Sequence, residues 1–196
     1  MEELIVIYDK EKRDRGRDSY IRAIKKQIPG VRVADVANLP EVRRNKLLIL
    51  KPMNDGDYET LKTFLKHNPG RDIEGIGSGK LTITAEAIIR VIGPVDKKTV
   101  VIINQSDVLG RPLAKELIER GANVISLNSS YPCIDNLLTM TDIDVLVSAS
   151  GQGGFELDRE LTRMIDVKID LSNDLEDPIK ITSVPTIEVL KDRLKP

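Results

Sequence analysis

The sequence predicts an α/β protein of two domains with parallel sheets, the second domain being a Rossmann-like dinucleotide-binding domain. Short aliphatic runs alternate along the chain with segments in which apolar residues recur at helical spacing. This alternation is typical of parallel strands joined by crossover helices. Between the two halves, residues 71–80 are rich in glycine and charge, which indicates a linker. We expect a first domain over residues 1–80, completed by a C-terminal helix over 186–196, and a nucleotide-binding domain over 81–185.

In the first half, apolar runs predict three strands and apolar stripes predict two helices. The strands are expected at residues 4–8, 31–36 and 47–50. Tyr20, Ile24 and Ile28 recur at four-residue spacing, which predicts an amphipathic helix that a Pro-Gly pair ends. A second helix is expected over residues 58–68. The mixed-charge run 9–18 is interpreted as a solvated loop.

In the second half, strands and helices alternate more regularly. Thr84 is expected to cap a helix with one apolar face, formed by Ala85, Ile88, Ile89 and Ile92. Further strands are expected at residues 100–103, 124–127, 145–147 and 167–170. Further helices are expected at residues 108–120, 134–140, 158–164 and 187–194.

The composition excludes several classes of function. The 196 residues carry 30 basic and 31 acidic side chains, so no broad electrostatic attraction to nucleic acid or anionic lipid exists. One cysteine and one histidine exclude a disulfide framework and zinc sites with several Cys and His ligands. No apolar run approaches the ~20 residues that cross a bilayer, and the first residues lack the basic region of a signal peptide. We therefore expect a soluble cytoplasmic protein that binds neither nucleic acid nor membrane.

The segment Val100–Pro112 carries the most informative motif. A buried strand turns directly into a helix there, an arrangement whose free N–H groups and helix dipole can hold a pyrophosphate. Ser106 offers a hydroxyl, and Gly110 permits close approach of the backbone. Asn104 stands where a dinucleotide-binding fingerprint has its first glycine, so this turn alone fits an ordinary strand–helix connection equally well. A second turn of small residues, 148–154, makes a nucleotide-binding crevice the favoured interpretation.

Three other features are interpreted as structural rather than functional. The run Gly75–Lys80 lacks the leading glycine and the metal-binding hydroxyl of a phosphate-binding loop. His67 is expected to be a solvated residue at a helix end. Cys133 is expected to be a packed side chain rather than a nucleophile, because no basic partner is indicated nearby.

In order and spacing, these motifs resemble the bifunctional methylenetetrahydrofolate dehydrogenase/methenyltetrahydrofolate cyclohydrolases. The similarity extends from Leu4 to about Leu194 and is strongest over Val100–Pro112, where the family has the pattern Gly-Arg-Ser-x-x-Val-Gly-x-Pro. Further matching segments are Asp144–Gln152, Lys168–Asp170, Ile181–Pro185 and Arg71–Gly75. The resemblance implies a homodimeric enzyme that oxidises 5,10-methylenetetrahydrofolate, or a related one-carbon pterin, with NAD or NADP. Hydride transfer of this kind depends mainly on positioning of the two reacting carbons.

The resemblance also implies a set of site residues. Tyr20 matches a tyrosine of the cyclohydrolase reaction, and Glu74 replaces the family's folate-contacting aspartate, so these two are the candidate catalytic residues. Pro52 and Pro185 are the implied substrate contacts. The implied cofactor contacts are Thr84, Asn104, Gln105, Ser106, Gly110, Arg111, Asn128, Ser129, Ala149, Gly151 and Asn173. The resemblance implies no metal.

The sequence departs from the family pattern at positions that bear on activity. Ile24 stands at the family's lysine position and Leu50 at its glutamine position, while Lys25 lies about 100° around the helix. Without a titratable group at the reacting carbon, we expect cyclohydrolase activity to be weak or absent. Gln105 replaces an arginine associated with the 2′-phosphate of NADP, yet no acidic residue ends the strand 124–127. The choice between NAD and NADP therefore stays open.

Two functions from different classes fit these observations. The first is a dehydrogenase that forms reduced cofactor when supplied with a methylene-pterin. The second is a non-catalytic nucleotide-binding relative with a regulatory role, which would bind cofactor without turnover. An unrelated Rossmann-like reductase fits the order of the motifs less well.

Overall fold

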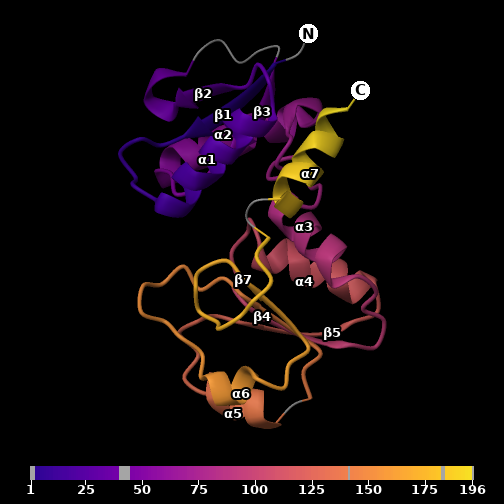
Figure 1. The fold of residues 1–196 in the computed structure, drawn as a ribbon. Helices are drawn as coiled ribbons and strands as arrows, with labels where there is room; N and C mark the ends of the chain where they lie inside the picture. The colour runs from indigo at the N-terminus through magenta and orange to yellow at the C-terminus, as the bar shows by residue number, and fades with distance from the viewer. Residues whose placement is uncertain (1–2, 40–44, 141, 182–183, 196) are drawn as a thin grey trace. The chain divides into compact units, whose positions relative to one another are not determined.

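The computed structural model describes residues 3–39, 45–140, 142–181 and 184–195. The chain divides into two compact units, one formed by residues 1–83 with 187–196 and the other by residues 84–186. The polypeptide passes between the units in two helices, α3 (Ile83–Ile92) and α7 (Val184–Leu194) (Figure 1). In the described part of the chain, none of the helices is long and apolar enough to span a membrane.

The first unit contains a three-stranded parallel sheet in the order β2-β1-β3. Its strands are β1 (Leu4–Tyr8), β2 (Arg32–Asp35) and β3 (Lys46–Ile49), and its helices are α1 (Arg15–Gln27) and α2 (Asp55–His67). Two short 3-10 turns, η1 (Val36–Asn38) and η2 (Pro69–Arg71), complete it. Aliphatic side chains of the central strand β1 and of its neighbour β3 are fully buried, which explains why both read as continuous apolar runs.

Most of the charged run after β1 is exposed, as predicted, but it includes the start of α1 and two buried residues. The Asp14 side chain accepts a hydrogen bond from the Arg17 N–H and caps α1, which starts at Arg15. Asp9 and Arg17 are both buried, and the Arg17 guanidinium donates to the carbonyl oxygens of Asp9 (2.8 Å) and Pro52 (3.3 Å). The interpretation of residues 9–18 as a water-facing loop is therefore wrong for this pair.

The glycine-rich segment after η2 is a packed loop of the first unit, so its interpretation as a linker is also wrong. The buried Asp72 carboxylate accepts hydrogen bonds from the N–H groups of Gly75 (2.8 Å), Gly77 (2.8 Å) and Ser78 (2.7 Å). A Cβ at Gly77 would lie 2.7 Å from backbone atoms of α2. The glycine thus permits close packing of this loop on α2 rather than flexibility.

The second unit contains a four-stranded parallel sheet in the order β5-β4-β6-β7. Its strands are β4 (Thr99–Ile103), β5 (Asn123–Leu127), β6 (Val145–Ser148) and β7 (Val167–Asp170). Besides α3, its helices are α4 (Gly110–Glu119), α5 (Ile134–Met140) and α6 (Arg159–Thr162). The α/β class with parallel sheets is confirmed. After β5 the chain continues on the other side of β4, so the strand order reverses between β4 and β6, where open α/β sheets bind ligands.

Several helix boundaries differ from the sequence prediction, and three of them matter for the interpretation. Helix α3 starts at Ile83, so Thr84 lies inside its first turn and the prediction that Thr84 caps it is wrong. Helix α6 is limited to four residues after its cap Asp158. Helix α7 starts at Val184, which places Pro185 in the first turn, where its missing N–H costs no hydrogen bond.

Candidate functional site

The turn after β4 is organised by the side chain of Asn104. Its Oδ1 accepts hydrogen bonds from the Ser106 N–H (2.9 Å), the Ser106 hydroxyl (2.7 Å) and the Gly110 N–H (2.9 Å). Its Nδ2 donates to the carbonyl oxygen of Ala149 (2.7 Å), the first residue after β6. A single half-buried side chain therefore fixes the loop after β4 and joins it to the loop after β6 at the reversal of strand order.

Gly110 is required by the close approach of α4 to this turn. A Cβ at position 110 would lie 1.8 Å from the carbonyl oxygen of Asn104, a separation that no side chain tolerates. The Arg111 N–H donates to the Ser106 carbonyl oxygen (3.0 Å), and Pro112 has no N–H. The N–H groups of Gly110 and Arg111 are thus engaged inside the loop, so the free N–H groups predicted for this turn do not include these two. The positive end of the helix dipole still lies here.

Three further candidates, Gln105, Asn128 and Ser129, lie beyond the carboxyl ends of β4 and β5. Gln105 Nε2 donates to the carbonyl oxygen of Ser126 (2.9 Å), so this exposed side chain bridges the carboxyl ends of β4 and β5. Asn128 Oδ1 accepts from the N–H and the hydroxyl of Ser130 (3.0 Å each), which encloses Ser129 in a tight turn. The structure brings these candidates to the carboxyl edge of the sheet.

Two buried aspartates that the sequence analysis missed hold the loops after β6 and β7. Asp174 accepts from the Ser148 hydroxyl (2.6 Å) and from the N–H and hydroxyl of Ser150 (3.1 and 2.8 Å). Asp170 accepts from the N–H groups of Ser172 (2.7 Å) and Leu175 (3.0 Å). The position of Asp170 directly at the end of a buried strand was an available signal, whereas the partners of Asp174 lie more than 20 residues away.

The candidates Gly151 and Asn173 occupy turns beside these aspartates. Both adopt positive φ angles, 66° and 65°. The Gly151 N–H donates to the Ser172 hydroxyl (3.0 Å), which joins the loops after β6 and β7. The side-chain oxygen of Asn173 accepts from Lys180 Nζ (3.4 Å). Left-handed backbone conformations favour glycine and asparagine, which accounts for both residue types.

In the first unit, the candidate Glu74 is buried beside a guanidinium from the end of α7. Arg193 donates to the carbonyl oxygens of Ile73 (2.7 Å), Glu74 (3.2 Å) and Leu81. Burial raises the pKa of Glu74 from 4.5 to about 8, an effect that Arg193 opposes and the neighbouring Asp72 carboxylate reinforces. The Glu74 carboxyl is therefore mostly protonated at pH 7 and able to donate a hydrogen bond.

The positions that differ from the family pattern are aliphatic and buried. On α1, Tyr20 is half-buried, Ile24 is fully buried and Lys25 is exposed, which confirms that Lys25 faces away from the packed side of the helix. Leu50 follows β3, is buried, and donates its N–H to the Ile7 carbonyl oxygen (2.9 Å). No ionisable side chain is thus supplied by positions 24 and 50.

The substrate candidates Pro52 and Pro185 belong to different units. Pro52 lies after β3, where its carbonyl oxygen is held by Arg17. Pro185 lies in the first turn of α7, and its neighbours Thr182 and Ser183 in the matching motif are outside the described residues. Among the described residues, no group of three or more His, Cys, Asp or Glu side chains is placed to hold a metal ion.

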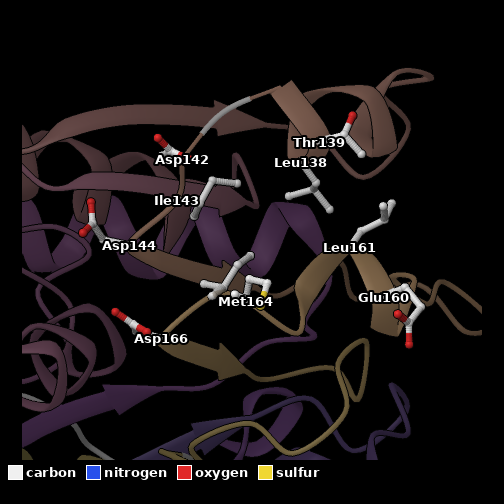
Figure 2. Close-up of a pocket in the computed structure, with 10 residues that line it drawn as sticks. Leu138, Thr139, Asp142, Ile143, Asp144, Glu160, Leu161, Met164 and Asp166 are labelled. Atoms are coloured by element: carbon white, nitrogen blue, oxygen red, sulfur yellow. The ribbon is translucent and has the colours of Figure 1, made fainter.

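A pocket of about 380 Å³ lies at the other edge of the second sheet. Asp144 directly precedes β6 and Asp166 directly precedes β7, so the pocket is at the amino ends of these strands (Figure 2). Met164 on its border is 82% exposed. Because Asn104 and Ala149 follow the carboxyl ends of their strands, this pocket is separate from the candidate site.

Comparisons with known proteins point to one family. Residues 82–178 match the family model of the tetrahydrofolate dehydrogenase/cyclohydrolase NAD(P)-binding domain. The bifunctional protein FolD of Dictyoglomus thermophilum is 27% identical over 175 residues, which cover 80% of this chain and 60% of that protein. The FolD of Staphylococcus aureus (strain MRSA252) is 24% identical over 211 residues, covering 91% of this chain and 73% of its own length. The chain thus matches less than two thirds of the Dictyoglomus protein.

Solved structures of the same kind share the fold. The NAD-dependent 5,10-methylenetetrahydrofolate dehydrogenase from Saccharomyces cerevisiae has a TM-score of 0.73 at 17% identity, covering 98% of this chain and 85% of that one. The methylenetetrahydrofolate dehydrogenase-cyclohydrolase of Trypanosoma brucei, complexed with NADP cofactor and inhibitor, has a TM-score of 0.69 at 18% identity, covering 98% and 84%. With the family model matched over almost its whole length, the second unit of this chain is a tetrahydrofolate dehydrogenase/cyclohydrolase NAD(P)-binding domain.

Proposed function

We propose that this protein oxidises 5,10-methylenetetrahydrofolate, or a closely related one-carbon pterin, by hydride transfer to a nicotinamide dinucleotide. The observation that carries the proposal is the Asn104 junction. It fixes the loops after β4 and β6 at the reversal of strand order, which is where sheets of this type bind dinucleotides. The relatives named as methylenetetrahydrofolate dehydrogenases support the choice of substrate.

The second unit would hold the cofactor, and the cofactor would supply the hydride acceptor. Since the N–H groups of Gly110 and Arg111 are engaged, the diphosphate contacts would come from side chains at the start of α4. The exposed Arg111 guanidinium is the candidate, assisted by the positive end of the helix, because the Ser106 hydroxyl already donates its hydrogen to Asn104 Oδ1. The loops that contain Ala149, Gly151 and Asn173 would border the rest of the dinucleotide.

The first unit would bind the pterin. Glu74, with its raised pKa, would present a protonated carboxyl to the substrate, and Tyr20 and Pro52 would contribute further contacts. Hydride transfer needs the donor and acceptor carbons to be held together, and no side chain has to exchange a proton in that step. The chemistry is therefore compatible with a site that contains few titratable groups.

Hydrolysis of a methenyl-pterin is the reaction that this chain would perform weakly or not at all. General-base attack of water requires a titratable group at the reacting carbon. Ile24 and Leu50 place aliphatic side chains at the two positions where the family pattern has a lysine and a glutamine. The same two residues are the reason to retain the second candidate, a non-catalytic nucleotide-binding protein.

Absorbance at the reduced-nicotinamide band tests the proposal. The full chain is incubated with NAD or NADP and a panel of methylene-pterins, and cofactor binding is measured separately by calorimetry. Formation of reduced cofactor with at least one pair supports the dehydrogenase. Binding without turnover, at high protein concentration, supports the non-catalytic relative, and absence of binding contradicts both.

We further propose a cytoplasmic homodimer without nucleic-acid or membrane partners. The near-balance of 30 basic and 31 acidic residues favours small-molecule ligands over polyanions. Light scattering of the full chain at several concentrations tests the dimer, and a monomer at all concentrations would contradict it.

A further inference from the structure

We propose that the dinucleotide site selects NAD over NADP, an inference that rests on the proposed function of this site. In sheets of this type, the group on the adenosine ribose 2′ carbon is recognised about 20 residues after the phosphate-binding turn, at the end of the next strand. An acidic side chain there accepts a hydrogen bond from a 2′-hydroxyl, whereas an arginine nearby accommodates a 2′-phosphate. The corresponding strand here is β5, which follows the Asn104 turn.

A neutral amide occupies the junction between the two strand ends. Gln105 Nε2 donates to the carbonyl oxygen of Ser126, 21 residues further along the chain, at 2.9 Å. This bond holds the glutamine side chain across the carboxyl ends of β4 and β5, and one amide N–H is used in holding it. The group fixed at this point is therefore polar and uncharged, suited to a hydroxyl rather than to a dianion.

The two loops that flank this junction contribute no cation. Residues 127–133 after β5 are Leu-Asn-Ser-Ser-Tyr-Pro-Cys, and residues 104–109 after β4 contain a single charged residue, Asp107, which is an anion. Asn128 and Ser130 are bonded to each other and keep the loop after β5 compact. The nearest arginine in sequence, Arg111, lies at the start of α4, which is the end of the helix that faces a diphosphate.

A 2′-phosphate brings a charge of about −2 near pH 7, and such groups are bound well where arginine or lysine forms charge-assisted hydrogen bonds. At this junction a 2′-phosphate would lose hydration water, and the two flanking loops would supply no cation in exchange. The one charged residue of the loop after β4, Asp107, carries a charge of the same sign as the phosphate. A 2′-hydroxyl would exchange water for amide and hydroxyl partners at little cost. We expect NAD to bind at least about tenfold more tightly than NADP.

Calorimetry with NAD and with NADP tests this preference on the full chain, since the sequence lacks tryptophan for a fluorescence readout. Gln105→Arg should raise the affinity for NADP at least about tenfold and lower that for NAD, because the amide partner of the 2′-hydroxyl is lost. Gln105→Met removes the amide without adding charge and should leave NADP weak. Asn123→Arg adds the same charge at the exposed amino end of β5 and should not improve NADP binding.

The outcomes separate this inference from the proposed function. Equal or tighter binding of NADP by the wild-type chain overturns the inference and leaves the dehydrogenase proposal standing. Equal gains of NADP affinity in Gln105→Arg and Asn123→Arg also overturn it, because the effect would then be general charge rather than local recognition. Failure of the wild-type chain to bind either dinucleotide overturns the proposed function and the inference together.

Discussion

Replacement of Asn104 by alanine should disorganise the turn after β4 and weaken NAD binding, while the protein remains folded. The substitution removes four hydrogen bonds: three accepted by Oδ1 and one donated to Ala149. A net contribution of about 0.5–1.5 kcal/mol per bond gives roughly 2–6 kcal/mol, and water access to a half-buried site reduces this to about 2–3 kcal/mol. Since the N–H groups of Ser106 and Gly110 lose their acceptor, the turn should reorganise and NAD affinity should fall by a factor of about ten or more.

Urea unfolding followed by circular dichroism and calorimetry with NAD provide the two measurements. Asn128→Ala is the matched control, because Asn128 organises an exposed turn with two bonds and should cost less than about 1 kcal/mol. Asn104→Asp retains the three accepted bonds and loses the donor to Ala149, so its stability should be intermediate. If Asn104→Ala changed stability and NAD affinity no more than the control does, the central role of this side chain would be refuted.

Three further predictions concern the first unit. The folded-state pKa of Glu74 exceeds its unfolded value, so its burial should lower the stability as pH rises from 4.5 to about 8, by up to roughly 5 kcal/mol. Glu74→Gln should flatten that decline in urea unfolding at pH 5, 7 and 9, and an unchanged slope would contradict the assignment. Asp72→Asn should cost about 2–3 kcal/mol, because a neutral amide oxygen replaces a carboxylate that accepts three N–H bonds, and a loss below about 0.5 kcal/mol would count against that role. Ile24→Lys with Leu50→Gln, checked for folding because Ile24 is fully buried, should increase methenyl-pterin hydrolysis. Unchanged hydrolysis in a folded double variant would show that these positions are assigned wrongly.

Strands were the part of the fold that could be predicted most closely. Leu4–Tyr8 and Val167–Asp170 have the predicted bounds, and the first is an almost continuous aliphatic run because a central strand in a parallel sheet is covered on both faces. Helix ends were less predictable, since caps such as Asp14 depend on which of several polar residues the backbone turn selects.

Charged and glycine-rich segments were misread because their partners are distant in sequence. Residues 9–18 are mostly charged and were expected to face water, yet the Arg17 guanidinium donates a hydrogen bond to the carbonyl oxygen of Pro52, 35 residues away. The segment after η2 looks like a linker, yet Arg193, about 120 residues further along, binds its carbonyl oxygens. A local pattern contains no information about such bonds, which decide burial once the chain is folded.

In the candidate site, the position of the turn could be predicted from the sequence, but its hydrogen bonds could not. Sequence spacing identified the turn after β4, but it treated Asn104 as damage to a glycine fingerprint. In the structure this asparagine supplies the acceptor that gathers the turn, while Gly110 alone provides the close approach. Asp174 was missed for the same reason, since its bonds to Ser148 and Ser150 appear only in the fold, whereas the bonds of Asp170 are local to the loop after β7.

A common device in both units bears on which reaction this chain can support. Asp72, Asn104 and Asp174 each accept several hydrogen bonds from polar hydrogens of a loop, and these bonds hold the loops in place. Such loops are suited to holding two reactants, which is what hydride transfer requires. They provide no ionisable group at positions 24 and 50, which hydrolysis requires. The residues that are present therefore favour the proposed dehydrogenase reaction over hydrolysis.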